Sequence, residues 1–92
     1  MARPKLTRKI STKLKTRIFV PVDVIMPEDA FLEADELEAL KLKDMLALDQ
    51  KEAAKAMAIS QPTFHRIIKN ARKKIAEALV KGKVIKIKES MK

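Results

Sequence analysis

The chain has 92 residues, of which 47% are hydrophobic and 36% charged, and its only aromatic residues are three Phe. A chain of this length buries only about 60 to 65% of its unfolded surface, which excludes a second folded domain and leaves one small domain with an aliphatic core. Lys and Arg number 21 against 12 Asp and Glu, and this net charge of +9 favours a polyanionic partner such as nucleic acid.

The same composition excludes several kinds of site. The lack of Cys and the single His exclude a disulfide framework and most zinc and acid–base constellations. The longest apolar runs, residues 18–22 and 24–27, fall far short of the roughly 20 residues that span a bilayer, and the basic N-terminus lacks the apolar stretch of a secretion signal. We therefore expect a cytoplasmic, nucleoid-associated protein that is not an enzyme and that needs no metal or cofactor.

Residues 1–17 form a basic N-terminal arm with seven basic side chains and no acidic one. Residues 18–60 then hold four bases against ten acids, and residues 61–92 hold ten bases against two acids. Charge needed only for solubility would be interspersed, so this segregation predicts a directed binding face on the domain 18–92. The arm is either a solvated tail or an arm that enters a minor groove. Its candidate phosphate-binding residues are Arg3, Lys5, Arg8 and Lys9.

Two short extended segments flank the helical part of the chain. Residues 18–22 are rich in β-branched side chains, and residues 84–88 alternate apolar with basic side chains as an edge strand does. Pro21 keeps the first segment at a sheet edge, and residues 26–32 are interpreted as a connector. A lone strand pair is marginal in water. The pair must therefore lie on a helix or form across a dimer, and both arrangements stay open.

Acidic pairs mark two helix starts. Asp35 with Glu38, and Asp49 with Glu52, have the spacing in which a cap and the third helical residue satisfy each other's backbone N–H groups. Both pairs also place carboxylates at the positive end of the helix dipole. The predicted helices and their inward residues are 36–45 with Leu37, Ala39, Leu40 and Leu42, and 50–57 with Ala53, Ala54 and Met57.

A third and longer helix begins at Ser60, whose hydroxyl can cap it, and has Pro62 in its first turn, where a missing N–H does little harm. Gly82 can take the positive φ that ends a helix, so the helix is expected to end near Val80 or Lys81. Its length of roughly 30 Å exceeds a major-groove contact, so its second half must pack on something else. The stripe with helical spacing that we expect to be buried is Phe64, Ile67, Ile68, Ala71, Ile75, Ala78 and Leu79.

Residues 50–69 fit the pattern of a helix-turn-helix motif, in which small or apolar residues let two helices meet at a steep angle. Ala54 is small enough for the third helix to approach, Ile59 fills the turn and Phe64 anchors the third helix. Ala58 stands where glycine is usual, and a positive φ there would cost around 1 kcal/mol or more. The outward face then carries the candidate base-reading residues Ser60, Gln61, Thr63, His65, Arg66 and Lys69.

Five segments carry a resemblance to a known family: DELEALKLKD (35–44), QKEAA (50–54), SQPTF (60–64), ARKKIA (71–76) and ALVKGK (78–83). They are similar to a family of small, uncharacterised prokaryotic proteins. Members of that family are predicted DNA-binding proteins whose helix-turn-helix resembles region 4 of bacterial sigma factors. The resemblance covers most of the chain and implies DNA binding and a regulatory role. The chain departs from the family at Ala58 and at Gln61, where a basic residue is common.

We therefore predict a mainly α protein with a three-helix helix-turn-helix domain that binds double-stranded DNA sequence-specifically and regulates transcription. The helix that starts at Ser60 is expected to lie in the major groove, while Lys51, Arg72, Lys73 and the arm contact phosphates. A single motif reaches few base pairs. We accordingly expect a homodimer on a palindromic site, paired through the long helix or the terminal strands.

Alternatives to this function stay open. The Lys-rich arm also suits a non-specific chromatin or architectural protein, for which specific and random duplexes bind alike. The acidic first helix suits a module that docks on the transcription machinery. An RNA-binding role is less supported, because the three Phe are expected to be buried and leave no stacking platform for single strands. His65 either reads a base, touches a phosphate or contacts nothing.

Overall fold

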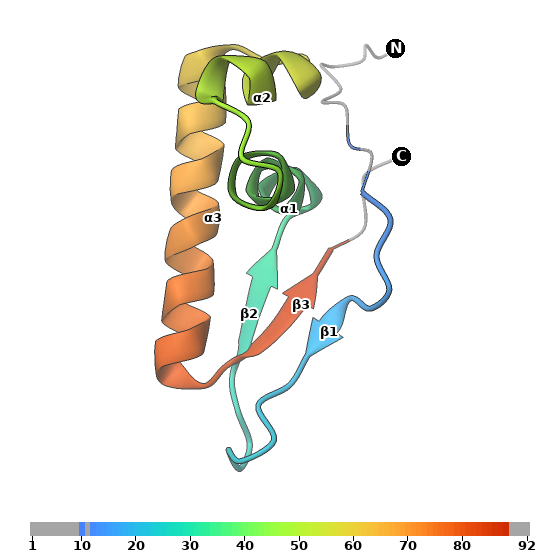
Figure 1. Ribbon diagram of the computed structural model, residues 1–92. Coiled ribbons are helices and arrows are strands. Elements are labelled where there is room, and N and C mark those ends of the chain that lie inside the picture. The colour runs from blue at the N-terminus through green and yellow to red at the C-terminus, as the bar shows by residue number, and fades with distance from the viewer. Residues whose placement is uncertain (1–9, 11, 89–92) are drawn as a thin grey trace, which may run out of the picture.

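The computed structural model describes residue 10 and residues 12–88, which form three helices and a small three-stranded sheet (Figure 1). The elements in chain order are β1 (Ile18–Phe19), β2 (Asp29–Leu32), α1 (Ala34–Leu40), the π-helical segment η1 (Lys41–Met45), α2 (Gln50–Ala56), α3 (Gln61–Lys81) and β3 (Val84–Ile87). The predicted mainly helical class with short strands is thus confirmed. Residues 1–9 and 11, and with them most of the predicted arm, lie outside the described residues.

α2 and α3 begin and end within one residue of where the sequence predicts. The Asp49 carboxylate accepts a hydrogen bond from the Glu52 backbone N–H at 2.8 Å, and the Glu52 carboxylate accepts one from the Asp49 N–H at 3.2 Å. Ser60 Oγ accepts a hydrogen bond from the Thr63 N–H at 3.2 Å at the start of α3. Gly82, with φ of 64°, ends that helix. These local caps satisfy backbone groups that a helix end leaves open.

α1 begins two residues earlier than predicted, so the assignment of Asp35 as its cap is wrong. Glu33 is the N-cap, and its backbone N–H donates to Glu36 Oε1 at 2.9 Å. Glu38, predicted to pair with the cap, is buried instead, because its carboxylate accepts a hydrogen bond from the Thr12 backbone N–H at 3.0 Å. The acidic spacing therefore marks the helix but not its first residue.

The core lies where the helices meet and is aliphatic apart from Phe64. Phe19 and Phe31 are 53% and 47% exposed, so the expectation that all three Phe are buried is wrong. The buried residues of the core are Ala39, Leu42, Ala53, Ala54, Met57, Phe64, Ile67 and Ile68. A second cluster, formed by Leu32, Ala71 and Ile87, joins α3 to the sheet. Each buried Leu, Ile, Phe or Met side chain contributes about 1.5 to 3 kcal/mol. Both clusters therefore fix the long helix α3 against the rest of the domain.

The strands pair within the chain, which settles the choice that the sequence leaves open. The sheet has the order β1-β3-β2, with β3 antiparallel to β1 and parallel to β2. In register, Ile18 of β1 faces Lys86 of β3, and Ala30 of β2 faces Ile85 of β3. The sheet therefore has a strand, β2, inside the segment 26–32, and the interpretation of that whole segment as a connector is wrong.

β3 is the central strand, so the prediction of an edge strand over 84–88 is also wrong. Its lysines keep contact with neighbouring strands: Lys86 forms an ion pair with Asp29 at 2.9 Å. Lys86 and Lys88 also lie over the Phe31 ring, with their Nζ atoms 6.0 and 5.5 Å from the ring centroid. The apolar–basic alternation thus reflects the two faces of a paired strand and not an open edge.

Leu79, which the helical spacing assigns to the buried stripe of α3, is 72% exposed, so this prediction is wrong. It lies only about 40° around the helix from Ile75, but it lies one turn further along. There α3 extends past α1 towards the loop before β2 (Figure 1). No helix among residues 12–88 covers that side of the last turns.

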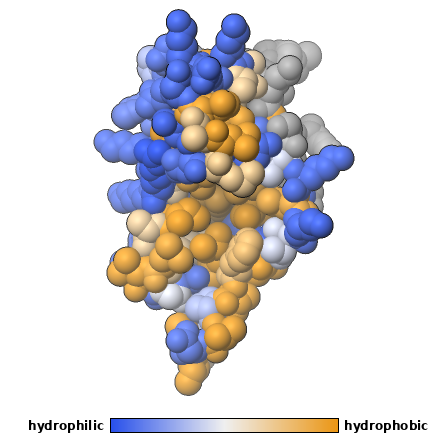
Figure 2. All heavy atoms as spheres, in the orientation of Figure 1, coloured by the Kyte–Doolittle hydropathy of each residue, from blue (hydrophilic) through white to orange (hydrophobic). Residues whose placement is uncertain are grey.

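The molecule has a polar end and an apolar end. In Figure 2, hydrophilic residues gather over the upper part, which in Figure 1 is the region of α2 and the first half of α3. Hydrophobic residues dominate the lower part, over the last turns of α3 and the loop that joins β1 to β2. The two ends therefore present different chemistry to a partner.

Candidate nucleic-acid interface

Small residues let α2 pack closely on α3. Ala53 and Ala54 are both buried, and Phe64 of α3 has no exposed surface. In the connection between the helices, the Ile59 N–H donates to the Ala54 carbonyl at 3.0 Å, and Ala58 has φ of 60°. A left-handed backbone costs a residue with a Cβ about 1 to 2 kcal/mol. The positive φ considered for Ala58 is therefore present, and the tight turn bears its cost.

Arg66, Lys69 and Lys73 form a row along the exposed side of α3. Their spacing of three and four residues places them on one helix face, separated by about 4.5 and 6 Å along the axis. All three side chains are exposed, and none pairs with an acid of residues 12–88. Cations without a competing carboxylate are available to neutralise phosphates or bind base edges.

The residues at the start of α3 are partly engaged with one another. Ser60 Oγ, which caps the helix, also donates to Thr63 Oγ1 at 2.9 Å. Gln61, the first residue of α3, is exposed and has no hydrogen bond from its side chain to residues 12–88. The structure thus places Ser60, Gln61 and Thr63 together at one end of the basic row, with Gln61 the most available of the three.

His65 lies on the exposed side of α3, within reach of α2. The Gln50 amide Nε2 is 3.4 Å from His65 Nδ1, across the junction of the two helices. Gln50 is the first residue of α2, so this contact links the start of one helix to the first turns of the other. His65 therefore contacts α2 and is not a solitary surface residue.

Arg72, predicted to hold a phosphate, is paired with Asp44 of η1. Its Nη2 donates to Asp44 Oδ1 at 2.6 Å and its Nε donates to Oδ2 at 3.2 Å, which is a two-point contact. The hydrogen bond from Arg72 holds the pKa of Asp44 below its ordinary value of 3.8. Arg72 therefore joins η1 to α3, and a phosphate would compete with a carboxylate for its guanidinium.

Two exposed polar residues escaped the sequence reasoning. Asn70 follows Arg66 by one turn of α3, and its amide has the paired donor and acceptor that match adenine. It lies one residue beyond the motif window 50–69, so extension of the helical spacing from Arg66 could have found it. Lys55 is exposed on α2, as is the predicted Lys51. Residues 50–73 together hold six bases and one acid.

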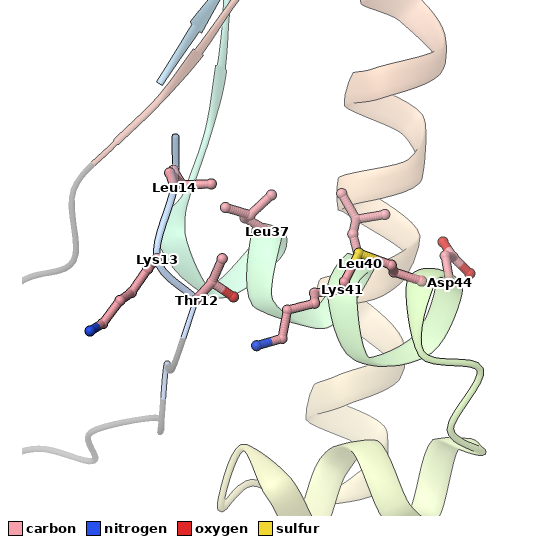
Figure 3. A pocket seen from close by; sticks show the side chains of 8 residues that line it. Thr12, Lys13, Leu14, Leu37, Leu40, Lys41 and Asp44 are labelled. Atoms are coloured by element: carbon pink, nitrogen blue, oxygen red, sulfur yellow. The ribbon is translucent and has the colours of Figure 1, made fainter. Parts of the chain in front are cut away.

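The part of the arm that the structure describes is anchored on α1 through Thr12. Both the backbone N–H and the hydroxyl of Thr12 donate to the buried carboxylate of Glu38. Beside this contact an open hollow of about 580 Å³ lies between that segment and the helix formed by α1 and η1 (Figure 3). Its lining is Thr12, Lys13, Leu14, Leu37, Leu40, Lys41, Asp44 and Met45. The predicted phosphate residues Arg3, Lys5, Arg8 and Lys9 lie outside the described residues, so the structure places only residue 10 and residues 12–17 of the arm.

Other kinds of site receive no support from the part of the chain that the structure describes. Among residues 10 and 12–88, no group of His, Cys, Asp or Glu is arranged to hold a metal ion. No helix within this range combines the length and the apolar character needed to cross a bilayer.

The structure defines the class of protein: a small helical domain that presents the basic face of one well-packed helix. Comparison with known proteins gives the family. Residues 1–90 match the family described as "Protein of unknown function DUF134", and the chain belongs to that family. This confirms the resemblance to small, uncharacterised prokaryotic proteins.

Three bacterial relatives, each somewhat longer than this chain, illustrate the similarity. UPF0251 protein VV2_0946 of Vibrio vulnificus is 50% identical over 88 residues, which cover 92% of this chain and 87% of the relative. UPF0251 protein Teth39_0655 of Thermoanaerobacter pseudethanolicus is 44% identical over 89 residues, 95% of this chain and 75% of the relative. UPF0251 protein DET0218 of Dehalococcoides mccartyi is 45% identical, with 95% and 76% coverage. No solved structure matches the chain.

Proposed function

We propose that the protein binds double-stranded DNA sequence-specifically and regulates transcription, with α2, the turn and the first half of α3 acting as a helix-turn-helix of the sigma region 4 type. The observation that carries this proposal is the row of exposed, unpaired bases Arg66, Lys69 and Lys73. The opposite side of the same helix is buried through Phe64 and Ile68. Because the row is rigidly supported, it can enter a major groove without the cost of ordering a loop.

Base reading is assigned to the residues on the free side of α3. Arg66 has the donor geometry for guanine, while Gln61 has the paired donor and acceptor for adenine. Lys69 lies one turn below His65 and contacts either a base or the adjacent phosphate. Ser60 and Thr63, which are bonded to each other, position the start of the helix and offer their remaining hydroxyl capacity to the groove.

Phosphate contacts are assigned to cations around that row. Lys73 continues it along α3, and Lys51 is exposed near the start of α2. Arg72 is assigned to the edge of the interface, because Asp44 already holds its guanidinium. Phosphate contacts fix the register of the protein on DNA but read no sequence. Association with the nucleoid follows from this proposal.

Selection of bound sites from a random duplex pool tests this function. We expect enrichment of a defined site that binds about 10³-fold or more tightly than random duplex, since specific regulators show ratios of this size. A pool that stays random through successive rounds, with equal affinity for all duplexes, would contradict the proposal. That result would instead favour the non-specific architectural alternative.

A further inference from the structure

The apolar end of the molecule carries large side chains that the described chain leaves uncovered. Val22 is 98% exposed, Ile25 90% and Val80 84%. With them lie further exposed apolar residues from the same loop and helix, and we define the apolar end as Val20, Val22, Ile25, Met26, Leu79 and Val80. None of these residues takes part in the DNA-binding face proposed above.

The loop and the helix end form one continuous surface. The Val84 backbone N–H donates to the Glu28 carbonyl at 2.8 Å, which ties the end of the loop to the chain that leaves α3. A Cβ atom at Gly82 would lie 3.0 Å from Val24 Cγ2, so the middle of the loop touches the end of the helix. Figure 2 shows hydrophobic residues over most of this lower region, with a few hydrophilic residues between them.

The area of this surface suits an interface between folded chains. Full burial of a large apolar side chain contributes about 1.5 to 3 kcal/mol, at about 25 cal/mol for each Å² of apolar surface. Each of the six side chains therefore exposes on the order of 100 Å². The sum, roughly 600 Å², is at the upper limit of the apolar patches that monomers expose. It also approaches the roughly 800 Å² that each partner buries in a standard specific interface.

The charges around the apolar end favour a second copy of this chain as the partner. The loop with its flanking residues, 18–29, holds three acids and no base, whereas the helix end, 76–83, holds two Lys and one Glu. Lys81 forms an ion pair with Glu77 of its own helix at 3.4 Å, but its side chain stays 63% exposed and can also reach a second carboxylate. Asp23 is exposed between two exposed valines. In a two-fold pair, the loop of each copy meets the helix end of the other, so opposite charges face each other twice.

We propose that the apolar end is the homodimer interface, with Asp23 of one copy facing Lys81 of the other around a two-fold axis. This arrangement also keeps the basic segments 50–73 of the two copies apart, because each lies at the far end of its α3. The interface is separate from the DNA-binding face, and its existence does not depend on that function.

Sedimentation equilibrium of the full chain without DNA tests the interface. We expect dimers at tens of micromolar protein, and a dimerisation Kd raised at least tenfold by Ile25→Asp and by Val80→Asp. Both positions are nearly fully exposed, so both variants should keep the wild-type helix content by circular dichroism. Met45→Asp is the matched control, because Met45 is 71% exposed on η1 and lies outside the apolar end.

Wild-type protein that stays monomeric over this range would overturn the proposal, as would a dimer that both apolar-end variants leave unchanged or that Met45→Asp weakens equally. A charge exchange tests the geometry further. Asp23→Lys and Lys81→Asp should each weaken self-association, and an equimolar mixture of the two variants should restore it, since both contacts are complementary in the mixed dimer. A mixture that associates no better than either variant alone would rule out this pairing.

Discussion

Among the residues of α3 that are assigned to base reading, Arg66 makes the clearest prediction. Arg66 is exposed on the side of α3 that faces away from the core, and its guanidinium has no partner among residues 12–88. Its donors are therefore free for a base edge. We predict that Arg66→Ala weakens binding to the selected site by about 1 to 3 kcal/mol and relaxes the preference at one base pair. Fluorescence titrations against the selected and a random duplex measure both effects. Equal losses on the two duplexes would remove Arg66 from base reading.

Lys73 should behave differently from Arg66, because a phosphate contact carries no sequence information. Lys73→Ala is expected to weaken all duplexes alike and to reduce the slope of log K against log salt by about one. Lys88→Ala is the matched control, with an unchanged slope, because Lys88 is exposed just after β3 and lies outside both the proposed DNA-binding face and the apolar end. A Lys73 variant with an altered base preference but an unchanged slope would contradict the assignment.

The backbone at Ala58 makes a prediction about stability. Its φ of 60° is unfavourable for Ala, and Gly relieves that strain at some cost in unfolded-state entropy. We expect Ala58→Gly to raise the free energy of unfolding by about 0.5 to 1 kcal/mol in urea titrations. Ala56→Gly is the control: Ala56 is exposed in the last turn of α2, so Gly should destabilise there. Destabilisation by both substitutions would show that Ala58 is not strained.

At the scale of elements, the Asp44–Arg72 contact joins η1 to α3, and its contribution should depend on pH. The folded pKa of Asp44 is lowered by the hydrogen bond from Arg72. The stabilisation is therefore fully present above the ordinary pKa of 3.8 and is lost as the pH falls through the lower, folded value. Because both groups are largely solvated, the effect should not exceed about 1 kcal/mol.

Asp44→Asn provides the measurement of this contact. The unfolding free energy of the wild type should exceed that of the variant near neutral pH, and the difference should fall towards zero in acid below pH 3.8. A difference that stays constant through this range would mean that the carboxylate charge contributes nothing.

The helices could be predicted because their signals are local. Asp49, Ser60 and Gly82 each lie within a few residues of the groups that they satisfy. The sheet could not, because the central place of β3 depends on pairing with residues 29–32, which are more than fifty positions away in the chain. The Glu38 carboxylate escaped prediction for the same reason, since its partner Thr12 lies 26 residues earlier.

The candidate site follows the same division. Arg66 and Lys69 could be assigned to one exposed face from helical spacing alone, and the structure exposes both. The engagement of Arg72 could not be foreseen, because Asp44 lies 28 residues away and belongs to a π-helical segment. Leu79 failed because the periodicity of a helix does not tell where its packing partner ends.

At the scale of the whole molecule, charge and apolar surface are separated along α3. The region 50–73 holds six bases and one acid, whereas the ranges 18–29 and 76–83 around the apolar end together hold four acids and two bases. A +9 chain that associates through its least basic end adds affinity for DNA without bringing its basic faces together. The proposed DNA-binding face and the proposed dimer interface thus lie at opposite ends of α3.

Chemical-shift mapping of the isotope-labelled chain with its selected duplex tests the central claim most directly. The account predicts the largest changes in the first half of α3, at Gln61, Arg66, Lys69 and Asn70, with smaller changes at Lys51. It predicts that the shifts of Leu32 and Ile87 stay at the values that they have in the dimer without DNA. Shifts confined to the sheet or to α1, with the exposed side of α3 unaffected at saturation, would contradict it.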